Sequence, residues 1–168
     1  MKRGICAVAV MVMAMGALAG AQAADVKLIL ATGGTAGTYY PFGGAMAKIW
    51  NSKIPGMNVT AQTTGASAEN IRLINKKEVE LALVQSDTLD FAFKGVEVFK
   101  EKLTGMSAIA VLYPEIIQVV VRRESPVKFF SDLKGMKVGV GAPGSGTEAN
   151  FRQLLDAYGM KKEDVKAQ

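Results

Sequence analysis

The chain has 168 residues, a formal net charge of +5 at pH 7 and no histidine. The lack of histidine excludes serine–histidine and cysteine–histidine catalysis, and also zinc or facial-triad iron sites that use imidazole ligands. The basic residues occur as isolated doublets without interleaved aromatic residues, so the positive charge does not predict a nucleic-acid surface.

The first 23 residues have the pattern of a secretory signal peptide. Two basic residues near the start precede an apolar stretch at residues 5–18 and an A-x-A cleavage pattern at residues 21–23. An uncleaved membrane anchor is the alternative, but alanine, glycine and methionine make the stretch only mildly apolar. The only cysteine, Cys6, lies in this segment. The sequence therefore predicts a periplasmic mature chain without a disulfide or a thiolate ligand.

The first half of the mature chain alternates predicted strands with predicted helices. Residues 26–31 form an apolar run that is interrupted only by Lys27, and such a run is typical of a strand buried on both faces. Ser67 and Ser86 are the expected N-caps of two helices, because a serine hydroxyl can accept from the first free N–H groups of a helix. The predicted elements in order are strand 26–31, helix 41–51, strand 57–61, a helix opening at Ser67, strand 79–84 and a helix opening at Ser86.

The second half contains two apolar runs, residues 106–112 and 116–121, which are separated by Tyr113-Pro114-Glu115. The composition changes over residues 122–128, where we expect a second lobe to begin. Alternation of strands and helices along the whole chain predicts an α/β protein with a largely parallel sheet. The elements expected after the change are strand 136–140, helix 147–158 and a helix stop at Gly159.

Three strand-to-helix junctions are rich in glycine and hydroxyl residues: residues 31–41, 63–70 and 141–148. Backbone N–H groups at a helix start are unpaired and carry a partial positive charge, so small residues there can form a cradle for an anion. Each of these glycine or hydroxyl residues is also suited to a helix cap or a tight turn without any ligand. Three such junctions in one exported chain favour a site for a small anionic ligand.

The third junction also contains two partial nucleotide-binding motifs. Residues 139–144 fit the G-x-G-x-x-G pattern, but its first two glycines fall inside the predicted strand and Asp164 follows a charged turn instead of a strand. The spacing of Gly141 and Gly146 matches a P-loop, but Thr147 stands where the phosphate-binding lysine belongs. The P-loop interpretation is excluded. The dinucleotide interpretation stays open but is weaker than that of a cradle for a small anion.

Five segments carry a resemblance when they are taken together and in order: residues 33–41, 64–70, 83–87, 112–115 and 139–147. The chain resembles the TAXI family of TRAP transporter solute-binding proteins. The resemblance implies an extracytoplasmic receptor of the periplasmic binding protein type II fold. Two α/β lobes of such a receptor close over a small organic anion, frequently glutamate or glutamine, and deliver it to a TRAP membrane permease driven by an ion gradient.

Members of the family are considerably longer than this chain, so the resemblance predicts a C-terminally truncated receptor. It implies a signal peptide at residues 1–23, a first ligand-binding lobe at residues 24–122 and the start of an incomplete second lobe at residues 123–168. A truncated gene and a receptor completed by another chain both stay open as explanations.

The resemblance also implies which residues bind the ligand. The first junction would supply backbone and hydroxyl donors with two tyrosine walls, and the second would hold a carboxylate. The end of the third strand would offer an amide, a hydroxyl and, in Asp87, an acceptor for an ammonium group. The start of the last helix would hold the ligand from the second lobe, and no metal or cofactor is implied. The predicted ligand-binding residues are Gly33, Gly34, Thr35, Gly37, Thr38, Tyr39, Tyr40, Thr64, Gly65, Ser67, Gln85, Ser86, Asp87, Ser145, Gly146 and Thr147.

The sequence therefore predicts a binding protein and not an enzyme. Its expected partners are a small organic anion, either an amino acid or a dicarboxylate, and a TRAP membrane permease, with no nucleic acid. One alternative is a periplasmic α/β enzyme acting on a phosphorylated or nucleotide ligand, for which the sequence offers no suitable base or metal site. The other alternative is an inactive fragment without ligand affinity.

Overall fold

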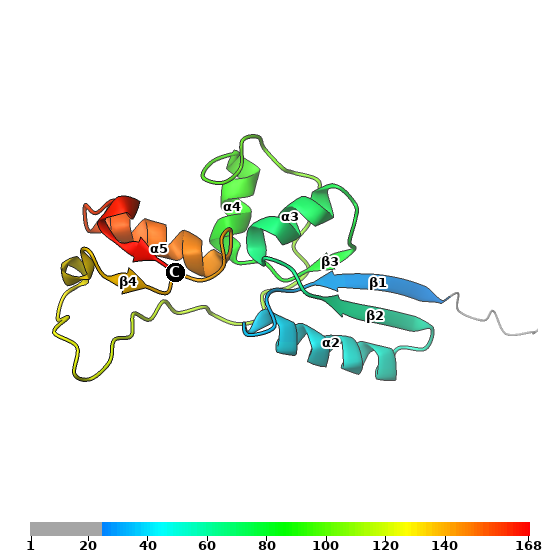
Figure 1. Cartoon of the computed structure of the whole chain (residues 1–168). Coiled ribbons are helices and arrows are strands. Elements are labelled where there is room, and N and C mark those ends of the chain that lie inside the picture. Colours follow the sequence, from blue (N-terminus) through cyan, green and yellow to red (C-terminus); the bar gives the residue numbers. More distant parts are fainter. Residues whose placement is uncertain (1–24) are drawn as a thin grey trace, which may run out of the picture.

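The computed structural model describes residues 25–168, so the predicted signal peptide lies outside the described residues. The first lobe contains a three-stranded parallel sheet in which β1 (Val26–Ala31) lies between β2 (Met57–Gln62) and β3 (Leu81–Ala82). Parallel neighbours need crossover connections, and the helices α2 (Tyr39–Lys53) and α3 (Ser67–Asn75) supply them. This arrangement confirms the predicted α/β class with a parallel sheet (Figure 1).

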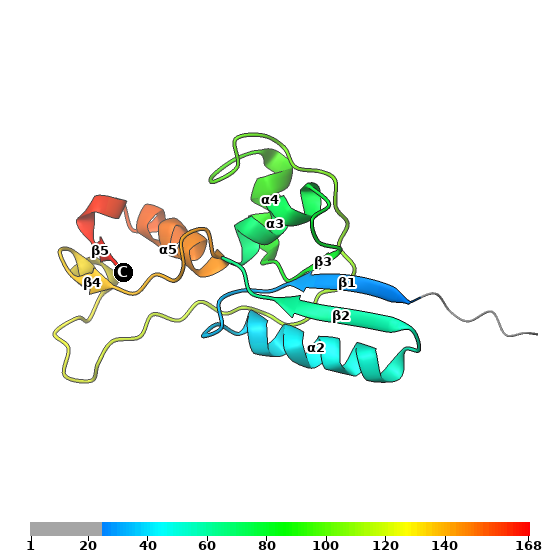
Figure 2. The same ribbon diagram turned by 45° about the vertical axis from the view of Figure 1, so that its right-hand side comes forward.

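The sheet is covered on both faces. In both ribbon views α2 lies on one side of the sheet, while α3 and α4 (Ser86–Lys94) lie on the other (Figures 1 and 2). The core under α2 consists of Leu30, Ala47, Val59 and Leu83. Gly43 allows α2 to approach the sheet, because a Cβ at this position would come within 2.6 Å of the Thr32 Cγ2 atom.

The second core lies between α3 and α4. It is formed by Ala68 and Ile71 of α3, Ala92 of α4, and Phe99 from the segment that follows. The Arg72 guanidinium lies over the Phe99 ring at 5.1 Å from its centroid. It also donates to the Val98 carbonyl oxygen at 2.8 Å, so this arginine stabilises the segment after α4.

Four local predictions were wrong, and a distant contact explains two of them. The strand predicted at residues 136–140 covers only Lys137–Val138. The third strand is shorter than predicted, because the Glu80 carboxylate accepts from the Ile29 N–H at 2.8 Å in the place of a strand partner. Ser67 is not an N-cap: Ala66 precedes the helix, and the Ser67 hydroxyl accepts from the Gln85 N–H at 3.1 Å. Ser86 is the first residue of α4 and does not cap it.

The segment that joins α4 to the second unit contains both apolar runs, and within the described residues neither run forms a helix or a strand. Its side chains are strongly exposed, for instance Ile109 at 83%, Val111 at 96% and Val120 at 83%. The segment passes close to the start of α2, because the Tyr113 and Phe42 rings meet edge to face at 5.4 Å.

The second unit follows this segment and contains a two-stranded parallel sheet. Its core consists of Leu133, Leu155, Met160 and Val165. The helix stop predicted at Gly159 is confirmed, since this glycine follows α5 with a φ of 63°. Among residues 25–168, no helix has both the length and the apolar character needed to span a bilayer. The elements of the unit are η1 (Phe130–Leu133), β4 (Lys137–Val138), α5 (Gly146–Ala157), η2 (Lys162–Asp164) and β5 (Lys166–Ala167).

Candidate functional site

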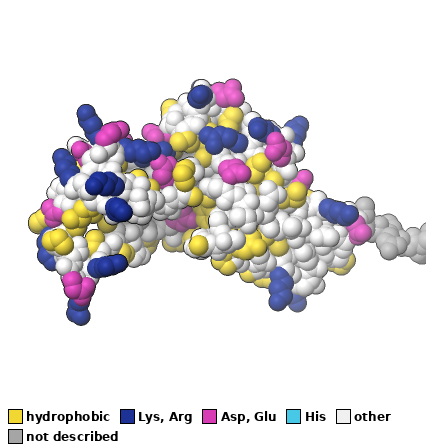
Figure 3. Space-filling view, viewed as in Figure 1, with side chains coloured by type: hydrophobic (Ala, Val, Ile, Leu, Met, Phe, Trp, Pro, Cys, Tyr) yellow, Lys and Arg dark blue, Asp and Glu magenta, His cyan; other side chains and the backbone are white. Residues whose placement is uncertain are grey.

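A cleft of about 1340 Å³ lies between the first lobe and the second unit. The space-filling view shows the molecule narrowing where these two parts meet (Figure 3). The cleft is larger than the roughly 300–1,000 Å³ that is usual for a small-molecule site. The cleft is lined by the start of α2, by the start of α5 with part of residues 133–142, and by much of the connecting segment between Tyr113 and Val127.

Ten of the sixteen predicted site residues line this cleft. They come from four helix starts, those of α2, α3, α4 and α5, which are far apart in the sequence. The other six do not line it: Thr35, Tyr40, Thr64, Gly65, Ser86 and Asp87. The residues that line it are Gly33, Gly34, Gly37, Thr38, Tyr39, Ser67, Gln85, Ser145, Gly146 and Thr147.

The start of α2 is the most open of these helix starts. The N-cap Thr38 makes no side-chain capping bond within the described chain, and the first turn contains no acidic residue. Gly37 donates to the Gly34 carbonyl oxygen at 2.9 Å, which closes the loop into a turn before the helix. A Cβ at Gly34 would meet no atom within 4 Å, so the loop borders open space. The positive end of the α2 dipole is therefore accessible to an anion.

The second junction is satisfied by its own side chains. The Gly65 N–H donates to Glu69 Oε2 at 2.6 Å, and the Ala66 N–H donates to Thr64 Oγ1 at 3.1 Å. Thr64 Oγ1 donates to Asn70 Oδ1 at 2.6 Å. These contacts explain why Thr64 and Gly65 shape the loop behind the cleft and leave only Ser67 of the predicted set on its surface.

Asn70 is the buried polar residue that fixes this junction to the sheet. Its side-chain amide donates to the Thr32 and Leu83 carbonyl oxygens at 2.7 and 2.8 Å. The carboxyl ends of β1 and β3 are thereby held beside the start of α3. Sequence analysis did not select Asn70, since its partners lie 38 and 13 residues away.

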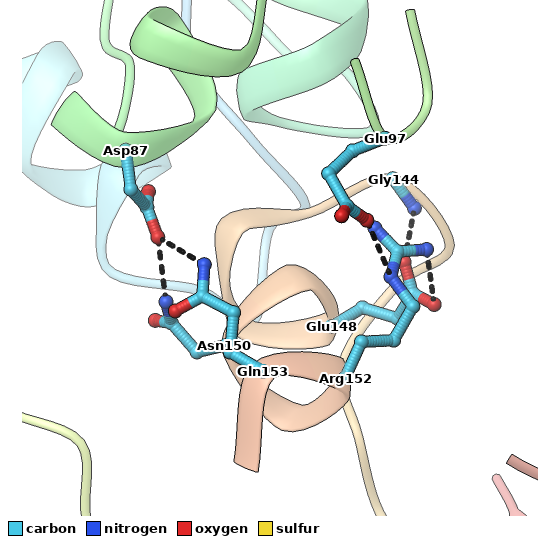
Figure 4. A network of polar contacts seen from close by, with 7 residues as sticks. All are labelled: Asp87, Glu97, Gly144, Glu148, Asn150, Arg152 and Gln153. Atoms are coloured by element: carbon cyan, nitrogen blue, oxygen red, sulfur yellow. Dashed lines mark hydrogen bonds and ion pairs between the residues drawn. The ribbon is translucent and has the colours of Figure 1, made fainter. Parts of the chain in front are cut away.

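Asp87 faces the second unit and not the cleft. Its Oδ2 atom accepts from Asn150 Nδ2 at 2.7 Å and from Gln153 Nε2 at 3.0 Å, both on α5 (Figure 4). Its Oδ1 atom accepts from Gln85 Nε2 at 2.9 Å and from the Thr88 N–H at 2.6 Å. The Thr88 hydroxyl is a fifth donor, to Oδ1 at 3.3 Å, so this carboxylate is already satisfied and leaves little room for the predicted ammonium contact.

The start of α5 is capped and docked, yet part of it remains on the cleft. Ser145 Oγ accepts from the Glu148 N–H at 3.1 Å, and Glu148 Oε2 accepts from the Gly144 N–H at 3.3 Å. This is a variant of the capping box. Gly146 lies against the Gln85 side chain, where a Cβ would overlap the amide. Thr147 lines the cleft and presents its N–H and its hydroxyl at the first turn of the helix.

A second set of contacts binds α5 to the first lobe. Arg152 pairs with Glu148 on its own helix at 3.0 Å and with Glu97, just after α4, at 3.8 Å (Figure 4). The Ala68 N–H at the start of α3 donates to the Gly144 carbonyl oxygen at 3.2 Å. The starts of α3 and α5 are therefore held next to each other, which keeps both at the edge of one cleft.

Among the residues of the cleft that sequence reasoning missed are Tyr113 and Glu115. Burial raises the pKa of Tyr113 to about 12, and the negative charge of Glu115 adds to the effect. Burial also raises the pKa of Tyr39, with a further rise from Glu115, while the Ser67 hydroxyl opposes it. The available signal was the Tyr113-Pro114-Glu115 break, which is a polar turn between two apolar runs.

The cleft carries charges of both signs. Arg122 and Lys137 line it together with the carboxylates Glu115 and Glu124. Within residues 25–168 no three histidine, cysteine, aspartate or glutamate side chains are grouped closely enough to hold a metal ion. The polar groups that line the cleft are thus backbone amides, hydroxyls, side-chain amides, two cations and two carboxylates.

A parallel sheet with helices on both faces, and helix starts that converge on a cleft beside a second α/β unit, define a lobe of a periplasmic-binding-protein-like protein. The model of the NMT1-like family matches residues 30–168, and the chain belongs to this family. The family is one of solute-binding receptors, so the chain has the character of a binding protein.

Proposed function

We propose that this protein is an extracytoplasmic receptor of a TRAP transporter of the TAXI type. It captures a small organic anion, such as glutamate, glutamine or a dicarboxylate, for uptake through a membrane permease. The observation that carries the proposal is the uncapped start of α2, which faces the start of α5 across a single cleft. Membership of a solute-binding family is consistent with this role.

The mechanism is capture without bond chemistry. The ligand carboxylate lies at the first N–H groups of α2, where the helix dipole contributes about 0.3–1 kcal/mol to the binding of a negative group. Thr147 of α5 and the cations Arg122 and Lys137 reach the ligand from the other side of the cleft. A ligand that contacts both sides binds the closed form better than the open form and so shifts the population towards it. The permease then recognises the closed form.

The test uses two glycines that are equally free of steric conflict. A Cβ at Gly34, in the loop before α2, and one at Gly44, on α2, would each meet no atom within 4 Å. Gly34→Glu places a negative charge at the helix start, whereas Gly44→Glu places the same charge away from the cleft. Calorimetric titration with glutamate, glutamine and succinate gives the affinities of both variants and of the unchanged protein.

We expect Gly34→Glu to weaken binding by about tenfold or more, because two like charges would then meet at one site. Gly44→Glu should bind as the unchanged protein does. Equal binding by both variants would show that the start of α2 does not receive the anion. A failure of every compound to bind would contradict the receptor function itself.

A further inference from the structure

Glu115 is the carboxylate of the cleft that lies among tyrosines. It follows Pro114 in the turn between the two apolar runs, and Tyr39 and Tyr113 line the cleft beside it. The hydroxyl oxygen of Tyr113 is buried and has no hydrogen-bond partner among the described residues. A buried hydroxyl without a partner is unfavourable, so a ligand group that bonds to it is favoured.

This cluster lies next to the helix start that the proposed function assigns to the anion. Tyr39 is the first residue of α2 and lies close to Gly33 in the preceding loop. A Cβ atom added to Gly33 would be 3.4 Å from the Cβ atom of Tyr39. The edge-to-face contact of Tyr113 with Phe42 holds the turn against the first turns of the same helix. A negative side chain therefore stands close to a positive helix end, and both border the same cleft.

The arrangement matches the two ends of a zwitterion. An ammonium group has three N–H donors, and the Glu115 carboxylate with the oxygens of Tyr39 and Tyr113 offers a matching set of acceptors. Asp87, the other candidate for this contact, is occupied by donors from α4, α5 and Gln85. A ligand with two carboxylates and no ammonium group would instead bring a second negative charge next to Glu115.

We infer that Glu115, together with Tyr39 and Tyr113, is the specificity-determining element that receives the ammonium group of a zwitterionic ligand whose carboxylate lies at the start of α2. The inference rests on the proposed receptor function and narrows it. Amino acids are accepted, and the corresponding dicarboxylates and other deamino compounds are rejected.

The experiment compares pairs of compounds that differ by one ammonium group: glutamate with glutarate, glutamine with glutaramate, and aspartate with succinate. Affinities are measured by calorimetric titration of the purified protein, of Glu115→Gln and of Glu124→Gln. The last variant is the matched control, because Glu124 is the other carboxylate that lines the cleft. Tyr113→Phe removes only the hydroxyl oxygen and leaves the ring contact with Phe42 in place.

We expect the amino acid of at least one pair to bind about tenfold or more tightly than its deamino partner, a ratio that corresponds to about 1.4 kcal/mol. Glu115→Gln should remove most of this preference by weakening amino acid binding, while Glu124→Gln should keep it. Tyr113→Phe should reduce it by a smaller factor, because only one acceptor is lost.

Two kinds of result would overturn the inference. The first leaves the proposed receptor function in place, and the second contradicts it as well. The first kind is equal binding of both members of each pair, or a preference for the amino acid that is unchanged in Glu115→Gln. Either result would show that Glu115 does not receive the ammonium group, without contradicting the receptor function. Binding of no compound in any pair would contradict the receptor function and the inference with it.

Discussion

Asp87 joins the first lobe to the second unit, and its replacement tests how α5 is held. The Asp87→Asn substitution keeps the shape of the side chain and changes one oxygen into an amide group. Two of its hydrogen bonds reach α5, from Asn150 at 2.7 Å and from Gln153 at 3.0 Å. If the new amide group faces α5, donors meet donors there. If it turns around, it meets the donors of Gln85 and Thr88 instead.

The first orientation loses the two hydrogen bonds to α5, whereas the second loses three, because the Thr88 hydroxyl also donates to Oδ1 at 3.3 Å. The amide group of the variant is therefore expected to face α5. A hydrogen bond in a partly exposed site contributes about 1 kcal/mol, so the loss amounts to about 2 kcal/mol for the docking of α5. This corresponds to a roughly 30-fold larger population of the undocked form. The free energy of unfolding of the first lobe should change much less, because its two hydrophobic cores do not involve Asp87.

Hydrogen exchange followed by mass spectrometry measures this effect by segment. Peptides from α5 of Asp87→Asn should exchange about 30-fold faster, while peptides from β1 should keep their protection. Asp90→Asn is the control on the same helix, since Asp90 pairs with exposed Lys94 at 2.6 Å and such surface pairs contribute little. Unchanged exchange in α5, or an equal increase in both regions, would refute the assigned role of Asp87.

Two further predictions concern the first lobe. Gly43→Ala should lower the free energy of unfolding, measured in urea, by about 1–3 kcal/mol because its Cβ would press on Thr32. Gly44→Ala on the same helix should raise this free energy by up to about 1 kcal/mol. The opposite order would contradict the close approach of α2 to the sheet. Asn70→Asp should destabilise the protein by about 3 kcal/mol or more at pH 7.5, because an ionised oxygen would face the Thr32 and Leu83 carbonyl oxygens. The folded state would raise the pKa of the introduced carboxyl group, so the loss should shrink as the pH falls towards 4; a pH-independent loss in urea unfolding would argue against this contact.

The agreement between prediction and structure is best where the pattern is local. The apolar run at residues 26–31 is strand β1 with the same bounds, and the helix predicted at residues 147–158 is α5, shifted by one residue. Side-chain periodicity and a glycine stop reflect contacts within a few residues, which a sequence displays directly. Helix α2 is two residues longer at each end than predicted, because helix ends depend on weaker signals.

Two of the disagreements involve contacts between residues that are distant in the sequence. Glu80 shortens the third strand by bonding to Ile29, which lies 51 residues earlier. The Ser67 hydroxyl does not cap its helix because it accepts from the Gln85 N–H, 18 residues later. Short polar side chains have several possible backbone partners, and the fold decides which of these partners comes within reach.

The sequence by itself determined the α/β class, the parallel sheet and the positions of the glycine-rich helix starts, because these depend on local periodicity and on turn chemistry. Only the tertiary structure decided which of those helix starts share the cleft. It directed Asp87 towards α5, closed the Thr64–Gly65 junction with its own side chains and brought Glu115 beside Tyr39. Hydrogen bonds and charges act over a few ångströms in space, and the distance between two groups along the chain does not reveal that separation.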